Sequence, residues 1–383
     1  MVESTGALVI PEGSEGTVAS SRGQQAQVHR IAVIPGDGIG LEVVPAGMEV
    51  LDAAASVDGT FQMRYETFPW SCRYYHETGR MAPPDFLEQL RGYDAIFLGA
   101  VGDPSVPDHV SLWGLLLPIR RTFQQYVNLR PARLLRGVPT PLAGRGPADI
   151  DFWVVRENNE GEYSNMGGRL YPGTPHEIVI QNSVFTRRGV ERVMRYAFEL
   201  ARRHPKRRLT SATKSNGINY TMPFWDEVFR ALSSEYPDVA TDQYHIDALA
   251  ARFVTHPQRF GVVVASNLFG DILTDLGAAI AGSIGIAPSA NLNPERVYPS
   301  MFEPIHGSAP DIAGQGIANP IGQIWSGAMM LEHLGHPEAA RRIMAAVEHT
   351  LGDRGVKTPD LGGKATTRQV TQTIIDALLE GEH

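Results

Sequence analysis

The sequence predicts an α/β protein in which helices cover a substantial β-sheet, and two observations support this fold class. Short β-branched runs alternate with amphipathic helical segments from Ile31 onward, which is typical of a sheet with helices on its faces. The composition is that of an ordinary globular protein, with 43% hydrophobic and 20% charged residues. A chain of 383 residues favours about two or three domains.

The expected elements follow one another along the chain without internal repeats. Strands are expected at "IAVIP" (31–35), "FQMRYETF" (61–68), "YDAIFLGA" (93–100), "DFWVVRE" (151–157), "EIVIQNSVF" (177–185), "RLTSAT" (208–213) and "GVVVAS" (261–266). Helices are expected at 41–55, 189–203, 222–235, 322–335 and 337–351, and the C-terminal third reads mainly as helices. The Pro/Gly-rich segment 136–150 predicts a long surface loop.

Charge and cysteine content narrow the class of protein. A net charge of −8 argues against nucleic-acid or anionic-membrane partners, and the short basic cluster 201–208 reads as a solvated helix end. The single cysteine, Cys72, excludes an intramolecular disulfide and fits a reducing compartment, with a packed, inert thiol favoured over a catalytic one. Residues 1–29 lack a basic start and an apolar core, so we expect a disordered extension rather than a secretory signal. No apolar run is long enough for a membrane helix, and a cytoplasmic protein is expected.

A glycine-rich segment, "IPGDGIGLEV", imitates a dinucleotide-binding fingerprint. Its glycines, Gly36, Gly38 and Gly40, follow a G-x-G-x-G spacing rather than G-x-G-x-x-G, and Asp37 would place a negative charge near phosphates. A tight turn from strand to helix is therefore the preferred interpretation, and a conventional Rossmann fold is not expected.

Two acids on one helix face suggest a bound cation. In "SNLFGDILTDLGAAI", Asp271 and Asp275 are one turn apart and project from the same side of an otherwise apolar helix. Surface ion pairs would explain this spacing as well as a metal would. Arg120, Arg130 and Arg156 lie at the edges of apolar segments, where guanidinium groups could grip carboxylates or form surface pairs.

Five ordered motifs, "NLRP", "VVRENNEGEYS", "TKSN", "SNLFGDILTDL" and "EPIHGSAPDIAGQGIANP", resemble those of the metal-dependent β-decarboxylating dehydrogenases. That family includes isopropylmalate, isocitrate, tartrate and D-malate enzymes, and the resemblance covers the chain from about residue 30. It implies two α/β domains with a discontinuous first one: a cofactor-binding domain of 30–125 plus 272–383, and a substrate and dimerisation domain of 126–271. Substrate would lie in the cleft between them.

The resemblance assigns roles to several residues of the chain. Asp271, Asp275 and, from the partner subunit of a homodimer, Asp247 would be the ligands of Mn²⁺ or Mg²⁺, whose preference for oxygen ligands they match. Lys214 would assist deprotonation of the substrate hydroxyl across the dimer interface, and Tyr163 would protonate the enolate left by loss of CO₂. Whether K⁺ activates is left open.

The resemblance also places the cofactor in a loop outside any Rossmann motif. That adenosine-binding loop comprises Glu303, His306, Gly307, Ser308, Ala309, Asp311, Ile312 and Asn319. NADP-using relatives carry a basic residue and a tyrosine where this chain has Asp311 and Ile312. An aspartate accepts hydrogen bonds from free ribose hydroxyls and repels a 2′-phosphate, so NAD is the expected cofactor.

Within the resemblance, the side chains of the helix before Arg120 indicate which substrate is bound. Isopropylmalate enzymes typically have a glutamate where this chain has Trp113, and isocitrate enzymes have polar groups where Leu116 stands. We expect Trp113, Leu116 and Leu117 to fill the side pocket, so that only hydrogen or hydroxyl fits on C3, although Trp113 as simple core packing is the alternative. The expected reaction is NAD-dependent oxidative decarboxylation of D-malate to pyruvate and CO₂ with tartrate as a side activity. The alternatives are a tartrate or 3-isopropylmalate dehydrogenase and, less favoured because the metal and catalytic residues are present, a regulatory subunit.

Overall fold

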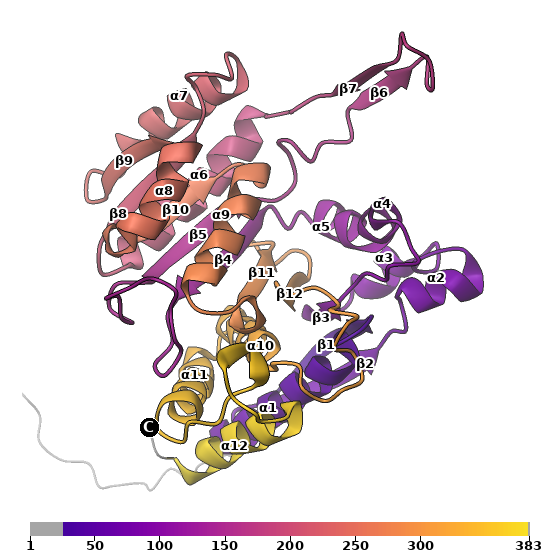
Figure 1. Cartoon of the computed structure of the whole chain (residues 1–383), viewed down its shortest axis with the longest axis vertical. Coiled ribbons are helices and arrows are strands. Elements are labelled where there is room, and N and C mark those ends of the chain that lie inside the picture. The colour runs from indigo at the N-terminus through magenta and orange to yellow at the C-terminus, as the bar shows by residue number, and fades with distance from the viewer. Residues whose placement is uncertain (1–25, 382–383) are drawn as a thin grey trace, which may run out of the picture.

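A ten-stranded mixed sheet runs through the molecule, with strand order β2-β1-β3-β12-β11-β4-β5-β10-β8-β9 (Figure 1). The computed structural model describes residues 26–381. The strands are β1 (Gln27–Gly36), β2 (Phe61–Thr67), β3 (Ala95–Ala100), β4 (Val127–Arg133), β5 (Asp151–Glu157), β8 (Arg208–Thr213), β9 (Ala240–His245), β10 (Val262–Ala265), β11 (Pro288–Leu292) and β12 (Ser300–Pro304). Pairing is antiparallel in β4·β5, β4·β11 and β11·β12, and parallel in the other pairs.

Helices cover both faces of the sheet. In the half that contains both ends of the described chain, α1 (Gly40–Asp58), α10 (Ile321–Leu334), α11 (Pro337–Gly352) and α12 (Thr367–Glu380) pack together on one face. The other face of that half carries α2 (Cys72–Thr78), α3 (Phe86–Leu90), α4 (Asp108–Ser111), the π-helix Leu112–Leu116 and α5 (Leu117–Thr122). In the other half, α6 (Arg187–Arg203) packs beside α7 (Thr221–Ser233), and α8 (Ile246–Thr255) beside α9 (Asn267–Ile280). The predicted α/β class with helices on both faces is thereby confirmed.

Alternating side chains explain why the sheet is buried on both sides. On β1, Ile31 and Val33 belong to the main hydrophobic core, whereas Ala32 and Ile34 belong to the core under α2–α5. The G-x-G-x-G segment is the tight turn between β1 and α1, as predicted. Asp37 accepts hydrogen bonds from the backbone N–H groups of Cys72 (3.0 Å) and Gly102 (3.1 Å), so it anchors neighbouring loops instead of facing a phosphate.

Several expectations require correction. Strand β1 begins at Gln27, inside the predicted 1–29 extension, because residues 27–29 pair with β2 and His29 is buried; residues 1–25 lie outside the described residues. The expected strand 177–185 shortens to β7 (Ile178–Gln181), which pairs only with β6 (Gly167–Leu170). Strands β11 and β12 are central in the sheet, although their short sequences "PSANL" and "SMFEP" lack a β-branched run.

The two-domain division stays a proposal, but its second boundary falls at an unsuitable place. A break at 271/272 would cut the continuous helix α9, which packs along its length against β4 and β5. The chain returns to the other half only after Ile280, where α9 ends. The segment 136–150 between β4 and β5 contains no helix or strand and is a loop, as expected.

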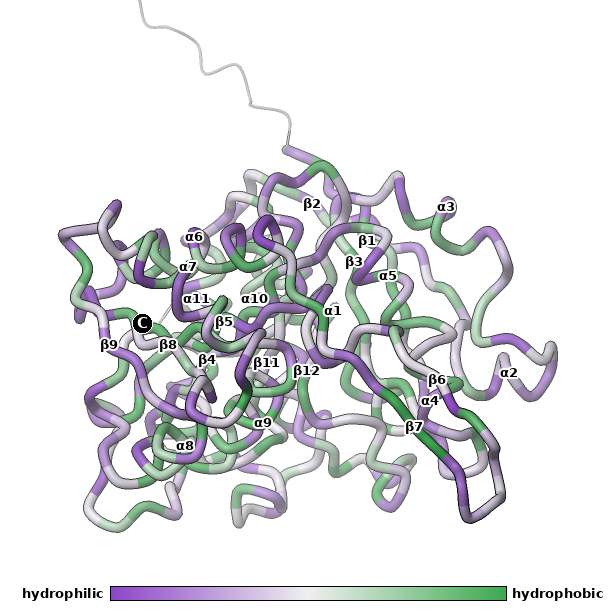
Figure 2. The backbone as a smooth tube through the Cα atoms, turned by 90° about the horizontal axis from the view of Figure 1, so that it is seen from above, coloured by the Kyte–Doolittle hydropathy of each residue, from purple (hydrophilic) through white to green (hydrophobic). Residues whose placement is uncertain are grey.

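The β6–β7 hairpin projects away from the body of the molecule (Figure 1). All of its strand residues are exposed, including Val179 (68%) and Ile180 (49%), and β7 forms an apolar stretch in Figure 2. An exposed, apolar two-stranded hairpin is marginally stable in water by itself, so it requires a covering surface. Among residues 26–381, no helix has the length and apolarity needed to cross a membrane.

Candidate active site

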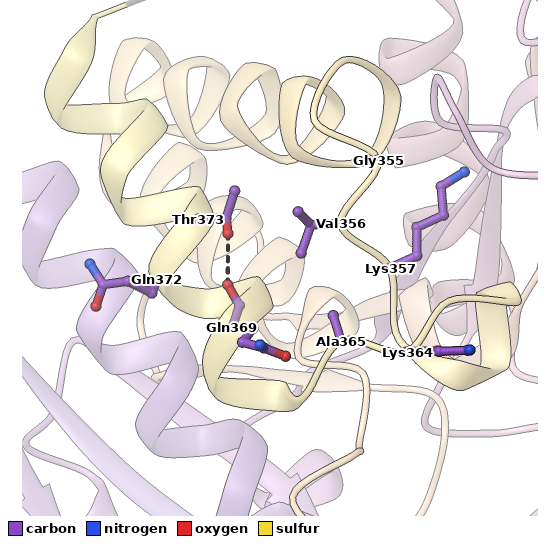
Figure 3. A pocket seen from close by; sticks show the side chains of 8 residues that line it. All are labelled: Gly355, Val356, Lys357, Lys364, Ala365, Gln369, Gln372 and Thr373. Atoms are coloured by element: carbon purple, nitrogen blue, oxygen red, sulfur yellow. Dashed lines mark hydrogen bonds between the residues drawn. The ribbon is translucent and has the colours of Figure 1, made fainter.

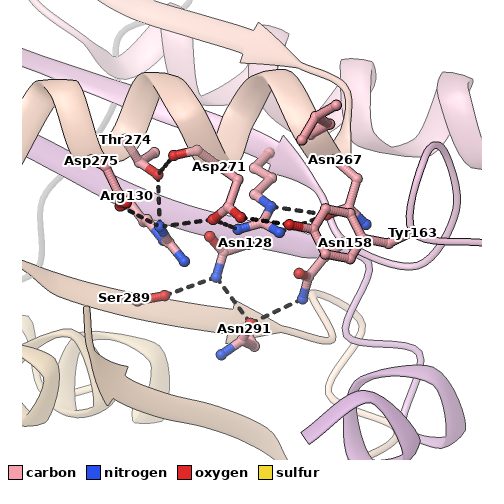
Figure 4. A network of polar contacts seen from close by, with 12 residues as sticks. Asn128, Arg130, Asn158, Tyr163, Asn267, Asp271, Thr274, Asp275, Ser289 and Asn291 are labelled. Atoms are coloured by element: carbon pink, nitrogen blue, oxygen red, sulfur yellow. Dashed lines mark hydrogen bonds and ion pairs between the residues drawn. The ribbon is translucent and has the colours of Figure 1, made fainter. Parts of the chain in front are cut away.

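The two acids of α9 lie beside a buried guanidinium. Arg130, on β4, places Nη1 3.6 Å from Asp271 Oδ1 and 3.7 Å from Asp275 Oδ1, and donates a 2.6 Å hydrogen bond to Thr274 Oγ1 (Figure 4). Within the described chain, therefore, the positive group that the spacing of the acids requires is Arg130. Asp275 remains largely exposed, with its side chain at 59%, so it has room for a further partner.

The fold brings the three predicted arginines together. Arg156, on β5, is 3% exposed; it forms an ion pair with Asp271 and donates to Asn267 Oδ1 at 2.7 and 3.0 Å. Arg120, at the end of α5, donates to Glu303 Oε1 at 2.7 Å and is 9% exposed. Burial of all three excludes the alternative of ordinary surface ion pairs. Because buried like charges repel, their clustering favours an anionic ligand.

The pKa values of the acids and arginines at this site are shifted by burial and by the neighbouring charges. Burial by itself would raise the pKa of Asp271, but the charges of Arg156 and Arg130 hold the pKa below its ordinary value. Burial also raises the pKa of Asp275, which has weaker compensation. The pKa of Arg130 is lowered to about 10 by burial and by the neighbouring charge of Arg156. Two donors, Arg120 Nε and Arg130 Nε, are buried without a hydrogen-bond partner among the described residues. Unpaired buried donors of this kind are typical of a ligand-binding site.

Tyr163 faces the same carboxylate from the loop after β5. Its hydroxyl donates to Asp271 Oδ2 at 2.8 Å, and its ring lies 5.4 Å below the Arg156 guanidinium carbon (Figure 4). Burial, followed by the hydrogen bond to Asp271, raises the pKa of Tyr163, so its proton is retained at neutral pH. The structure thus gathers Tyr163, the three arginines and both α9 acids at one place.

Arg121, which connects Trp113 to Tyr163, was missed in the sequence analysis. Its guanidinium carbon lies 4.6 Å from the centre of the half-buried Trp113 ring, and its Nη2 donates to the Tyr163 carbonyl at 2.6 Å. The double arginine "IRR" was a possible signal, but only the fold shows which of the two reaches Glu303. Residues 112–116 form a π-helix, a rare geometry that is frequent at functional sites.

The predicted side-pocket residues do not all line the site. Leu116 is buried within the hydrophobic core under α2–α5, so it acts as core packing there, and Leu117 is buried as well. The burial of Leu116 follows from the apolar face that Leu115, Leu116 and Ile119 present to that core. Trp113 remains the residue of this segment that is both partly exposed and connected to Tyr163.

Lys214 and Asp247 form a second, separate pair. Lys214 Nζ donates to Asp247 Oδ1 at 2.9 Å, and this contact lowers the pKa of Asp247. Within residues 26–381, neither residue forms a hydrogen bond or ion pair with Tyr163, Asp271 or Asp275. The described part of one chain also contains no group of three His, Cys, Asp or Glu side chains that could hold a metal ion. Asp271 and Asp275 offer the oxygen donors that a hard cation prefers, so they fit one, but as an incomplete set.

The predicted cofactor loop follows β12 and packs against the β1–α1 turn. The Ser308 carbonyl accepts a 2.8 Å hydrogen bond from Ile39 N–H, and a Cβ at Gly38 would meet that carbonyl oxygen at 2.0 Å. Glycine at 38 is thus required for close contact with this loop. Glu42 of α1 accepts from the N–H groups of Gly314 (2.6 Å) and Gly316 (3.0 Å), which fixes the far side of the loop.

Individual loop residues differ in how free they are to bind. His306 Nε2 is buried without a partner among the described residues, Gly307 borders open space, and Asp311 is exposed; these features fit a nucleotide. Ile312 and Ala309 pack instead against a small core of Ile39, Val43 and Ala318. Asn319 is engaged on both sides of its amide, donating to Asp360 Oδ2 and accepting from Ile321 N–H, both at 3.0 Å. Glu303 is the partner of Arg120 rather than a free loop residue.

Two other features lie apart from this chemistry. A cavity of about 530 Å³ beside α12 is lined by Lys357, Lys364, Gln369 and neighbouring residues, and its lining contains no Asp, Glu, His or Cys (Figure 3). Cys72 is fully buried, and burial raises the pKa of its thiol to about 12, as expected of a packed thiol.

Comparison with known proteins decides the family. The family model described as isocitrate/isopropylmalate dehydrogenase matches residues 30–378. The chain belongs to this family. It is accordingly an oxidoreductase, and the expected membership is confirmed. Members of the family depend on NAD(P) and a divalent metal and act on small molecules.

Similar proteins match nearly the whole chain in sequence. The D-malate dehydrogenase [decarboxylating] of Escherichia coli K12 is 61% identical over 91% of this chain and 98% of its own length. The tartrate dehydrogenase/decarboxylase of Pseudomonas putida is 58% identical over 92% of this chain and 98% of its own. In structure, isocitrate dehydrogenase from Methylococcus capsulatus superposes with a TM-score of 0.81 at 36% identity, covering 91% of this chain and 99% of that one.

Proposed function

We propose that the protein catalyses NAD-dependent oxidative decarboxylation of D-malate to pyruvate and CO₂, with tartrate as a second substrate. The observation that carries this proposal is the convergence of three buried arginines and Tyr163 on Asp271. This cluster suits a small dicarboxylate with a hydroxyl group. Extensive identity to the D-malate and tartrate enzymes supports the choice of substrate class.

In this mechanism, Arg120, Arg130 and Arg156 bind and orient the two substrate carboxylates through charge-assisted hydrogen bonds. Asp271 and Asp275, with the partner subunit's Asp247, would hold Mn²⁺ or Mg²⁺, which would supply Lewis-acid chemistry for the substrate, and the loop after β12 would hold NAD⁺ as the hydride acceptor. Lys214 of the partner subunit assists removal of the hydroxyl proton. After CO₂ leaves from C3, Tyr163 donates its phenolic proton to C3 of the pyruvate enolate.

Homodimerisation is part of the proposal because one chain holds only part of the site. Lys214 and Asp247 pair with each other away from Tyr163 and Asp271, and a second copy would deliver them. The exposed apolar hairpin β6–β7 offers a surface and strand edges that a second copy could cover. NAD is preferred over NADP because the exposed Asp311 would repel a 2′-phosphate. A cytoplasmic location stays a prediction.

Trp113 is proposed to restrict the C3 substituent. Its ring, held under Arg121, lies next to the segment that carries Tyr163, so a bulky substituent would compete with it for space. An apolar wall discriminates weakly against an added hydroxyl, which is why tartrate is expected as a second substrate.

The test is initial NADH production with Mn²⁺ at matched concentrations of D-malate, L-malate, L-tartrate, meso-tartrate and 3-isopropylmalate, repeated with NADP⁺. We expect D-malate to give the highest kcat/KM, NADP⁺ to be poorly used, and a chelator to abolish turnover. Trp113→Ala should then raise the kcat/KM for 3-isopropylmalate relative to D-malate by about tenfold or more. A 3-isopropylmalate preference of the unmodified protein would overturn the pocket argument, and inactivity with every substrate would favour a regulatory subunit.

A further inference from the structure

A second cavity lies behind the proposed active site. It has a volume of about 570 Å³ and is bounded by α6 on one side and α10 on the other, with strands β4, β5, β11 and β12 as its floor. We call it the rear groove. Its lining residues are Leu129, Trp153, Tyr196, Leu200, Arg203, His204, Pro205, Ala290, Leu292, Pro294, Arg296, Phe302, Met329, Glu332 and His333.

Strand alternation separates the rear groove from the active-site face. On β4, Arg130 reaches the α9 acids, whereas its neighbour Leu129 lines the groove. On β11 and β12, likewise, Asn291 and Glu303 bond to each other at 2.7 Å in the network that holds Arg120, while Ala290 and Phe302 face the groove. The groove is therefore a separate site built on the opposite face of the same strands. Its floor is apolar.

The rim of the groove carries two arginines whose guanidinium groups have no acidic partner within residues 26–381. Within residues 26–381, neither Arg203, near the end of α6, nor Arg296, in the β11–β12 turn, forms an ion pair or a side-chain hydrogen bond. Glu332 is the one acid in the lining, so the two arginines leave an excess of one positive charge. Burial lowers the pKa of His333 to about 4 and also lowers that of His204, so both rings are neutral at pH 7.

Arg296 is one of five non-glycine residues with a positive φ in the described part of the chain. Its φ is 56°, in the left-handed region that glycine and asparagine adopt at lower cost. The turn is fixed by Asn293, whose Oδ1 accepts from the N–H groups of Val297 (2.8 Å) and Tyr298 (3.1 Å). A long side chain in this conformation carries backbone strain, and such strain is frequent at ligand-binding positions.

We propose that the rear groove binds a small amphipathic organic monoanion, with an aromatic or branched apolar body on the strand floor and its acidic group between Arg203 and Arg296. The volume falls within the range of small-molecule sites, and an apolar strand floor beneath a charged rim suits a ligand with an apolar body and an acidic group. The net positive charge of the rim matches one negative charge. This proposal is independent of the reaction proposed above.

The probe is anilinonaphthalene sulfonate, an aromatic monoanion whose fluorescence rises in apolar sites, titrated into the full-length protein in saturating NAD⁺. NAD⁺ covers the cofactor site, which could otherwise take the dye. We expect saturable binding of one dye per chain, weakened roughly tenfold in Arg203→Glu and in Arg296→Gly, each of which removes one charge-assisted contact. Arg296→Gly should keep or raise the melting temperature, which separates lost binding from lost folding.

Two further variants make the test specific. Arg188→Glu changes the same charge on the same helix at an exposed position outside the groove, so its dye affinity should equal that of the unmodified protein. Leu200→Trp narrows the groove from its α6 side without altering charge and should reduce binding. Absence of saturable binding in saturating NAD⁺, or equal affinity in Arg203→Glu and Arg188→Glu, would each overturn the proposal.

Discussion

Tyr163 is held by two contacts that suit a proton donor. Its hydroxyl bonds to Asp271 at 2.8 Å, its carbonyl accepts from Arg121 at 2.6 Å, and burial keeps its pKa above the ordinary value. Tyr163→Phe removes the proton and leaves the ring in place. We expect kcat to fall by roughly 10²- to 10³-fold with little change in KM, as measured by NADH production with D-malate.

Tyr75→Phe is the matched control, since Tyr75 forms no side-chain hydrogen bond within the described residues and packs beside the core under α2–α5. It should retain full activity. If Tyr163→Phe matched it in kcat, Tyr163 would be a packing residue, and the enolate would receive its proton from another group.

Glu157, next to Arg156, predicts a pH dependence of stability. It is fully buried, and burial raises its pKa to about 7 although the N–H groups of Asn159 and Glu160 partly oppose this. Between pH 4.5 and 7 the folded chain therefore binds more protons than the unfolded chain at this residue, so the free energy of unfolding falls as pH rises. The loss is at most about 3 kcal/mol.

Urea unfolding at pH 5 and pH 8, compared between the unmodified protein and Glu157→Gln, measures this contribution. Because the variant cannot ionise at this position, it should lose less stability between the two pH values. Equal losses in both proteins would mean that Glu157 titrates near its ordinary pKa in the folded state.

At the level of residues, motifs predicted which side chains lie together better than which neighbours position them. Helical spacing placed Asp271 and Asp275 on one face, and the structure agrees. The sequence could not show that Arg130 reaches both acids, because that contact depends on how β4 lies across α9. For the same reason Leu116 was assigned to the pocket although it packs in the core, and Arg121 was overlooked.

Among the elements, α9 can pack closely against β5 because residue 270 is a glycine. A Cβ at Gly270 would lie 2.6 Å from both Cβ and Cγ of Arg156, so the helix can approach β5 closely only without a side chain there. Gly270→Ala should displace Arg156 from Asp271. Because a shift of about 1 Å at such a position can cost roughly 10²-fold, we expect kcat/KM for D-malate to fall by that order.

Gly277→Ala on the same helix provides the comparison. Both variants gain the same intrinsic helix propensity, about 1 kcal/mol, but the Cβ at 277 meets only the methyl group of Ala132, at 3.0 Å. The activity of Gly277→Ala should stay within a few-fold of the unmodified protein. Equal activities in the two variants would exclude control of Arg156 by the close approach of α9.

Elements with strong periodicity were predicted well, whereas those defined by tertiary pairing were not. Helices α1, α6, α7, α10 and α11 and most β-branched strands lie where the patterns placed them. Strands β11 and β12 escaped prediction because five-residue segments with Pro, Asn and Ser owe their conformation to partners on both sides. The π-helix has no recognisable sequence pattern, and strand β7 covers only Ile178–Gln181 of the expected strand 177–185.

At the scale of the whole molecule, the decisive question is whether two chains share each active site. One chain supplies Tyr163 and Asp271 together, while its Lys214 and Asp247 form a separate pair. Lys214→Ala and Tyr163→Phe homodimers should each be nearly inactive. In a shared-site dimer, co-expression of the two variants with different affinity tags would yield heterodimers in which one site combines the normal Tyr163 of one chain with the normal Lys214 of the other.

Random association makes half of the dimers heterodimers, each with one intact site of two, so about a quarter of the normal activity should return to the mixture. Doubly tag-purified heterodimers should show about half of the normal activity per dimer. These fractions follow from symmetry alone and do not depend on the identity of the best substrate. If each chain held a complete site, every site would contain one defect, and neither the mixture nor the purified heterodimer would exceed the homodimers; Lys214 would then have to act within its own chain.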